Sequence, residues 1–373
     1  MVFSDRLPGV PAFNNEDAVW HQTNYYGGQQ SKRLYIADKV FGARERHFGK
    51  YVEDNCEVAK ADIILCSTCY YFPLQTASRL ARKYGKPLVV DLRDIAEQWG
   101  NVPYMTHHMN TSERLNRLAR KVYEGMYLRM RNSVLGEARA VTTVSHWHQQ
   151  TLQKYNTATH LIYNGFDETE FVPKDVPADV FRITYTGKIY NTRFRDPRLL
   201  LQAVGEMLRD RELAEKDVKI CFRIDEQSIP ELEKLAREYG VEKVCETGKY
   251  IPKSELTDLL HSSSILLVLT CKSSETGPFG ILGTKFYEAL GVEKPVLCVR
   301  SDEGALAEVI SETDAGMAAN TTKEVKVFIS DKYNEWKQKG FTRQNVNKEA
   351  KQQFTRQYES TLFENYFRYC AGI

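Results

Sequence analysis

The chain has 373 residues, of which 42% are hydrophobic and 27% are charged, a composition typical of globular proteins and a length sufficient for two ordinary domains. Its net charge of +2 argues against the strongly basic class of nucleic-acid-binding proteins, and no basic-aromatic RNA motif is present. Because no apolar run is long enough to span a bilayer and no signal peptide opens the sequence, we expect a cytoplasmic protein, with peripheral membrane contact left open.

Eight cysteines are scattered without the paired spacing of a disulfide framework, which favours a reducing compartment. The Cys-x-x-Cys pair, Cys66 and Cys69, follows an apolar run without a thioredoxin-like context, so we interpret both as ordinary strand-end residues. Since no second pair exists to complete four zinc ligands, the sequence predicts no metal site and no cofactor.

The first sixty residues are the least regular part of the sequence. Residues 1–30 show no apolar strand of the kind that opens a Rossmann-like domain, although Gly27 and Gly28 precede a predicted helix at 31–41. From residue 61 onward short apolar runs alternate with amphipathic stretches, which is typical of a parallel sheet flanked by helices. The predicted elements of this half are strands at 63–66, 88–91, 141–144 and 160–163 and helices at 74–84 and 112–138.

Residues 166–180 are acidic and contain Pro173 and Pro177, which indicates a linker between two domains. A second alternating series follows this linker, and a last helix at about 347–369 carries aromatic residues at near-helical spacing. The predicted elements of the second series are strands at 183–186, 218–223, 243–246, 265–269 and 296–299 and a helix at 197–208.

The most informative stretch is a loop that enters a helix at Gly283 and Thr284. Free N–H groups and the positive end of the helix dipole suit a phosphate at this point, and Lys285 adds a cation. Glu288, about one turn further along, can accept two hydrogen bonds from a vicinal diol. We expect Gly291 to end the helix before a Lys-Pro-Val-Leu strand. The stretch therefore predicts a nucleoside diphosphate site, with the amides and Lys285 on the phosphates and Glu288 on the ribose.

This stretch resembles the donor-binding signature of family 4 glycosyltransferases, the retaining enzymes of the GT-B fold, and especially their bacterial polysaccharide subgroup. The resemblance implies an α/β fold of two Rossmann-like domains facing across a cleft. It implies an acceptor-side domain at 1–164, a nucleotide-sugar domain at 165–349, and a final helix at about 350–373 that returns to the first domain. Many relatives carry a second glutamate eight positions before Glu288; here that position is Gly280, and Glu275 is out of register.

A basic loop at 185–197 matches a second element of the same family. By this register Gly187 forms the turn, and Lys188 and Arg193 occupy the two cationic positions. Two cations aimed at a diphosphate would stabilise the leaving group without a metal. Arg195 replaces Arg193 if the register of the loop is shifted, and a solvated basic loop is the alternative interpretation.

Three further segments match family elements in the expected order. In the Lys-Pro-Leu-Val-Val-Asp-Leu-Arg-Asp run, Arg93 falls on a histidine and Asp94 on an aspartate of the relatives, which implies catalytic positions at the cleft. An Arg–Asp pair that only holds the turn is the alternative. The Thr-Val-Ser and Tyr-Asn-Gly-Phe-Asp segments close the first domain, and Ser145 is a candidate cleft residue. The loop at 276–283 is expected to wrap the donor sugar, with Glu275 supplying the carboxylate missing at Gly280, or with shape alone.

Residues 112–139 contain seven Arg and Lys residues against three Glu residues, interleaved with apolar residues at helical spacing. Such a basic amphipathic helix can rest on anionic lipid. A packed domain helix with a solvated basic face is the alternative.

Taken together, these motifs predict a retaining, metal-independent glycosyltransferase that moves a sugar from a nucleotide-sugar donor to a glycan or lipid-linked acceptor. Two alternatives stay open. A nucleotide-sugar epimerase of the same fold would need acid–base groups, for which His107 and His108 are the clustered histidines. A catalytically weak homologue that serves as an assembly partner is suggested by Gly280 and the irregular N-terminal region.

Overall fold

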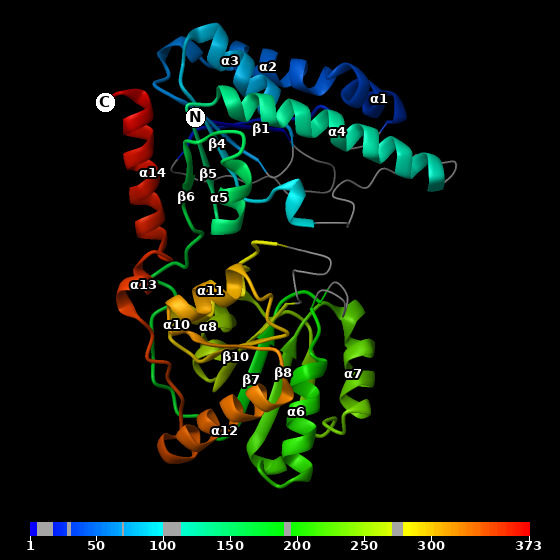
Figure 1. The fold of residues 1–373 in the computed structure, drawn as a ribbon, viewed down its shortest axis with the longest axis vertical. Coiled ribbons are helices and arrows are strands. Elements are labelled where there is room, and N and C mark those ends of the chain that lie inside the picture. Colours follow the sequence, from blue (N-terminus) through cyan, green and yellow to red (C-terminus); the bar gives the residue numbers. More distant parts are fainter. Residues whose placement is uncertain (6–17, 28–30, 69–70, 100–112, 190–194, 271–278) are drawn as a thin grey trace.

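The computed structural model describes residues 1–5, 18–27, 31–68, 71–99, 113–189, 195–270 and 279–373. The described chain forms two α/β units, one containing the N-terminus and one the middle of the sequence (Figure 1). Three sheets are present in these residues, with strand orders β1-β2, β3-β4-β5-β6 and β12-β11-β10-β7-β8-β9, and every strand pair is parallel. This confirms the predicted fold class of two Rossmann-like domains.

The first unit holds the four-stranded sheet. In this unit α3 packs between α2 and α4. Its main elements are β1 (Val2–Asp5), β2 (Trp20–Thr23), α1 (Lys32–Phe41), α2 (Ala43–Asn55), β3 (Ile64–Ser67), α3 (Leu74–Tyr84), β4 (Leu88–Leu92), α4 (Glu113–Glu137), β5 (Ala140–Thr143), α5 (His146–Leu152) and β6 (Thr159–Leu161).

The second unit holds the six-stranded sheet, whose first strand follows the predicted linker. Its elements, with the C-terminal helices, are β7 (Phe181–Thr186), α6 (Arg198–Arg209), β8 (Val218–Arg223), α7 (Ile229–Glu238), β9 (Cys245–Gly248), α8 (Lys253–His261), β10 (Ile265–Leu269), α10 (Thr284–Val292), β11 (Val296–Val299), α11 (Ala305–Glu312), β12 (Gly316–Ala319), α12 (Thr322–Lys339), α13 (Lys348–Gln352) and α14 (Arg356–Ala371).

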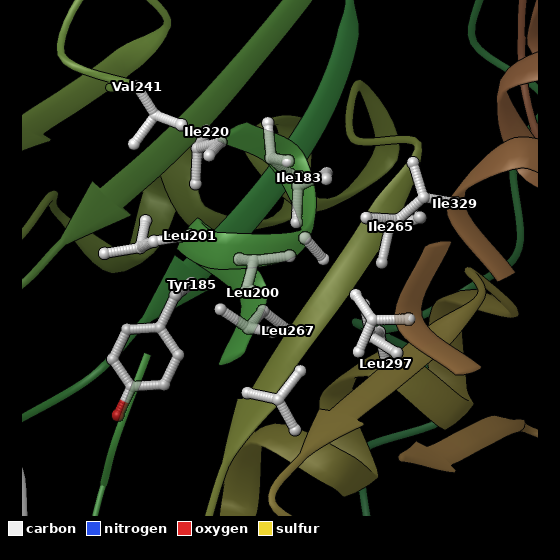
Figure 2. Packing of buried hydrophobic residues seen from close by; sticks show 14 of the residues in the cluster. Ile183, Tyr185, Leu200, Leu201, Ile220, Val241, Ile265, Leu267, Leu297 and Ile329 are labelled. Atoms are coloured by element: carbon white, nitrogen blue, oxygen red, sulfur yellow. The ribbon is translucent and has the colours of Figure 1, made fainter. Parts of the chain in front are cut away.

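The second unit has two core clusters, one between its sheet and the helices α6 and α12, and one between its sheet and the helices α10 and α11. Figure 2 shows Ile183, Ile220 and Ile265, from three neighbouring strands, packed with Leu200 and Leu201 of α6. All five side chains are fully buried. Because these strands are covered on both faces, they read as continuous apolar runs in the sequence, which is why their positions were predictable.

The N-terminal region forms a small sheet that the sequence did not indicate. The sequence shows no apolar opening strand in residues 1–30, and β1 and β2, neither of them an apolar run, form a parallel pair in which Phe3 stacks on His21 with ring centroids 4.8 Å apart. Neither strand is fully buried, and β2 reads Trp-His-Gln-Thr, so no apolar run marks it. A half-exposed strand needs no continuous apolar sequence, so the local pattern did not reveal this pair.

The helix α10 also ends later than predicted. Gly291 was expected to stop it, yet the helix continues to Val292 and terminates at Glu293, which has a φ of +54°. Gly291 serves a different purpose, because a Cβ there would lie 2.8 Å from the Phe166 ring and 2.7 Å from Phe171 Cβ. The glycine thus lets the linker pack directly on α10.

The chain crosses between the two units twice, and the two crossings touch. Phe166 N–H donates to the carbonyl of Phe354 (2.9 Å), and Arg356 N–H donates to the carbonyl of Phe166 (3.0 Å). The predicted last helix is two helices rather than one, because Thr355 breaks the helix and caps α14. As predicted, α14 returns to the first unit, where Phe367 and Cys370 pack on Val89 and Ala140 (Figure 1).

Candidate functional site

Loops that follow the carboxyl ends of strands from both sheets meet between the two units. Phe279, in the loop between β10 and α10, stacks on Trp147 of α5 with ring centroids 5.1 Å apart. Its N–H donates to the carbonyl of Gln98 (2.7 Å), which follows β4. Ligands of open α/β sheets bind at this edge, so the contact marks the candidate site.

The structure brings the two strongest sequence motifs together in the second unit. Gly187 directly follows β7 and has a φ of +148°. A Cβ at this position would lie 3.3 Å from Tyr185 Oη and 3.7 Å from Lys285 Cε. The turn therefore packs against the side chain of Lys285, in the first turn of α10. Two segments almost one hundred residues apart form one site.

The N-terminus of α10 is built as the sequence predicts. Gly283 is the N-cap residue with a φ of +60°, and no described side chain caps the helix. The first-turn N–H groups of Thr284 and Lys285 can therefore face a phosphate. The Lys285 ammonium lies 3.0 Å from Glu288 Oε2, so both predicted side chains share one face of the helix.

The basic loop is described only in part. Lys188 is exposed, and its carbonyl accepts hydrogen bonds from Tyr185 Oη (3.1 Å) and from the Arg195 guanidinium. Arg195 therefore lies beside Lys188 on the loop that carries the predicted cations. Arg193 and Glu275, both predicted site residues, lie outside the described residues.

The Arg93 guanidinium contacts three polar side chains and also lies over the Phe363 ring of α14. It lies 3.0 Å from Asp91 Oδ2, 2.7 Å from Asn164 Oδ1 and 3.0 Å from Glu359 Oε1, so it joins β4 to the segment after β6 and to α14. These are the contacts expected if Arg93 holds the turn. Asp94 is exposed and accepts a hydrogen bond from Gln98 Nε2 (2.8 Å), beside the Phe279 contact. Catalytic roles for Arg93 and Asp94 stay predictions.

Gly280 packs closely against α5 of the first unit. Its φ is +70°, and a Cβ there would lie 2.7 Å from Ser145 Oγ and 3.2 Å from His148 Nε2. A glutamate at this position, as in many relatives, would clash with α5 in this arrangement. Ser145, expected as a cleft residue, lies on this contact.

His148 is a residue of the site that the sequence did not indicate. Its side chain is 1% exposed, and neither ring nitrogen has a partner among the described residues. Burial lowers its pKa to about 4, so the imidazole is neutral near pH 7. No local pattern marks it, because its environment comes from Gly280, more than one hundred residues away.

The comparisons with known proteins agree with this geometry. Residues 177–353 match a glycosyltransferase family. The family is described as Glycosyl transferases group 1, and the match runs from the start of the second sheet to the end of α13. No curated protein sequence gives a significant match to the chain.

Solved glycosyltransferase structures resemble the chain over almost its whole length. Sucrose-phosphate synthase from Thermosynechococcus elongatus has a TM-score of 0.62 and 14% identity, over 97% of this chain and 86% of that one. HepE of Anabaena, in complex with UDP, has a TM-score of 0.59 and 13% identity, over 93% and 85%. The lipopolysaccharide outer core galactosyltransferase WaaB has a TM-score of 0.56 and 12% identity, over 94% and 84%. The chain therefore has the GT-B glycosyltransferase fold.

Among the described residues, no three or more His, Cys, Asp or Glu side chains form a group that could hold a metal ion. Cys66 is buried, and burial raises its pKa to about 12, which disfavours the reactive thiolate. Its sequence partner Cys69 lies outside the described residues.

Proposed function

We propose that the chain is a retaining glycosyltransferase of family 4 that moves a sugar from a nucleotide-sugar donor to a glycan or lipid-linked acceptor. The observation that carries the proposal is the packing of the Gly187 turn against Lys285 at the uncapped N-terminus of α10. The Glycosyl transferases group 1 match covers both segments. HepE, which has the same fold, binds UDP, UDP with glucose, and UDP-glucose in its crystal structures.

In this proposal the second unit binds the donor. The N–H groups of Thr284 and Lys285, the Lys285 ammonium and Lys188 contact the diphosphate, and Glu288 binds the ribose diol. Negative charge grows on the diphosphate as the glycosidic bond breaks, and fixed amides and cations stabilise it without a metal. Arg193 or Arg195 supplies the second cation, and the loop through Gly280 and Gly283 wraps the sugar, with Glu275 beside it. Arg93 and Asp94 face the acceptor side.

A lipid-linked acceptor in surface polysaccharide biosynthesis is the preferred substrate class. The supporting observation is an exposed apolar surface on the first unit, the α1/α4 face, formed by Ile36, Val40, Phe41, Leu118, Val122 and Met126, each at least 49% exposed. On α4 these residues follow a four-residue spacing, with basic side chains such as Arg114 and Lys121 exposed nearby. A cytoplasmic protein that rests on the membrane by this face fits both features, and none of the described helices is long and apolar enough to cross a bilayer.

The first test of the donor site is a thermal shift with UDP in EDTA. If amides and lysines supply the counter-charge, UDP at one hundred times its dissociation constant stabilises the fold by about 2.7 kcal/mol, with or without chelator. Lys188→Ala should lower turnover more than stability, because Lys188 is exposed and acts on charge that grows in the transition state. Loss of all binding in EDTA would overturn the metal-free mechanism.

Two other functions remain as alternatives that assays can separate. An epimerase of the same fold would convert the nucleotide sugar without an acceptor, and its candidate groups His107 and His108 lie outside the described residues. An assembly partner would bind a nucleotide without turnover. Transfer, epimerisation and hydrolysis assays with a panel of nucleotide sugars distinguish the three outcomes.

A further inference from the structure

The first unit contains a cavity that is separate from the proposed donor site. It has a volume of about 400 Å³ and is lined by residues of α1, α2, α3 and α4. These four helices lie together in the first unit (Figure 1). This volume is in the range of small-molecule sites. Its walls include carboxylates, an ammonium and aromatic rings, and its rim carries both apolar side chains and two arginines.

Glu45 of α2 presents an unpaired oxygen at this cavity. The residue is 7% exposed, and its Oε2 accepts hydrogen bonds from Thr76 N–H (3.0 Å) and Thr76 Oγ1 (2.5 Å) at the start of α3. Its other oxygen, Oε1, is buried and has no partner among the residues that the structure describes. Because buried polar atoms are almost always paired, Oε1 points to a bound group that donates a hydrogen bond.

The charges around Glu45 favour a neutral group. Asp38 is 4% exposed and accepts from Tyr26 Oη (2.5 Å), while the Lys39 ammonium lies 3.0 Å from Asp38 Oδ2 and 4.2 Å from the Tyr71 ring centroid. The buried wall thus carries two carboxylates and one ammonium. Two cations at the rim, Arg46 and Arg79, are engaged by the Phe41 carbonyl and by Glu53. An anion would meet the two carboxylates at the wall, whereas a hydroxyl group can donate to Oε1.

The aromatic and apolar lining indicates what surrounds that hydroxyl group. Tyr71 makes edge contacts with Tyr123 (6.2 Å) and Tyr127 (5.5 Å), which line the cavity with ring surface. At the rim, Val40, Phe41 and Met126 are 68%, 64% and 60% exposed, and they belong to the α1/α4 face. The cavity therefore opens onto an apolar surface.

We propose that this cavity binds the sugar part of a neutral glycolipid-like amphiphile, with a sugar hydroxyl on Glu45 Oε1 and the apolar chain along Val40, Phe41 and Met126. That this molecule is the acceptor rests on the proposed function; the binding does not. If the bound molecule is the acceptor, the acceptor is a sugar attached to an uncharged apolar chain.

Methionine methyl NMR on the whole chain tests the binding in the absence of donor. The probe is n-octyl β-glucoside below its critical micelle concentration, compared with glucose, octyl sulfate and octyltrimethylammonium. We expect n-octyl β-glucoside to shift the Met126 and Met130 methyls, which line the cavity, and to leave Met207 and Met317 of the second unit unchanged. Glucose should shift the same two signals at higher concentration.

Two variants locate the contact. Glu45→Gln keeps one oxygen that can accept hydrogen bonds from Thr76 at the start of α3, but it removes the carboxylate. Binding of n-octyl β-glucoside should therefore weaken about tenfold. Gln75→Trp, at an exposed position that lines the cavity, should block it even if Glu45→Gln fails to fold. Glu57→Gln, an exposed carboxylate outside the cavity, is the matched control and should bind normally.

The proposal is overturned by any of three results: no shift of Met126 and Met130, equal or stronger shifts with either charged amphiphile, or unchanged binding in Gln75→Trp. UDP binding is measured separately. A chain that binds n-octyl β-glucoside at Met126 but fails to bind UDP would refute the transferase and keep the cavity, and the reverse result would do the opposite.

Discussion

At the residue scale, the Lys285–Glu288 pair shows how a short motif becomes a site. The two side chains lie on one face of α10, 3.0 Å apart, beside the Gly187 turn. The pairing orients the Glu288 side chain, and a carboxylate can accept two hydrogen bonds from a diol. The spacing of the two residues is local, so the sequence predicted it; the proximity of Gly187 is a tertiary contact.

Glu288→Gln should weaken UDP binding by about 1.5–3 kcal/mol, because a charged hydrogen bond is lost while the shape of the side chain is kept. Isothermal titration calorimetry measures the change, and circular dichroism checks the fold. Glu308→Gln, on α11 and outside the site, is the control. Equal affinities for parent and Glu288→Gln would remove Glu288 from the ribose site.

A second prediction at the residue scale is that His148 makes the stability of the fold depend on pH. Its pKa is lowered from 6.5 in the unfolded chain to about 4 in the fold, so the unfolded chain binds the proton more tightly. Stability is then fully present above pH 6.5 and falls as the pH drops toward 4, by about 2 kcal/mol between pH 7 and pH 5. Urea unfolding of the parent and of His148→Phe at both pH values measures this contribution. If the free energy of unfolding changes with pH by the same amount in both proteins, His148 does not titrate in this range.

At the element scale, α4 has two different halves. Val134 and Leu135 are buried in the core of the four-stranded sheet and Tyr127 is buried at the cavity, whereas Leu118, Val122 and Met126 are 58–61% exposed. The sequence allowed both a packed helix and a lipid-facing helix, and the structure contains a packed C-terminal half and an exposed apolar N-terminal half. Such exposure of apolar side chains marks an interaction surface.

The double variant Arg114→Gln, Lys121→Gln should therefore weaken binding to anionic vesicles by about 1 kcal/mol per residue, and salt should weaken binding of the parent, since the attraction is screened. Vesicle flotation measures both effects. The matched control is Lys243→Gln, Lys249→Gln, two exposed lysines of the second unit. Flotation that is equal on neutral and anionic vesicles, or absent on both, would return α4 to a solvated face.

At the scale of the whole molecule, the two units are tied by the paired crossings and by α14. Arg93 is part of this tie, because it links β4, Asn164 after β6 and Glu359 of α14. Its contacts give it a structural role, and its position at the end of β4 gives it a candidate catalytic role. A double-mutant cycle separates the two.

If Arg93 acts through α14, Arg93→Ala and Glu359→Ala should each lower the free energy of unfolding. The double variant should lose less free energy of unfolding than the two single losses added together, and the difference, the coupling energy, should be about 0.5–3 kcal/mol. Turnover per folded molecule should then fall equally in both single variants. If Arg93 contacts the substrate, Arg93→Ala should lower turnover while Glu359→Ala leaves it close to that of the parent. Chemical denaturation and a transfer assay provide the two measurements.

The sequence by itself determined the alternation of strands and helices from residue 61 onward and the residues at the start of α10. The bounds of α3, β8 and β10 agree with the prediction, because apolar periodicity reports which face of a segment is buried. Tertiary structure alone decided the environments of His148 and Glu45, the continuation of α10 through Gly291 against Phe166, and the pairing of β1 with β2. The physical reason is that each of these depends on a neighbour far away in the chain, whose approach depends on packing and leaves no trace in the local pattern.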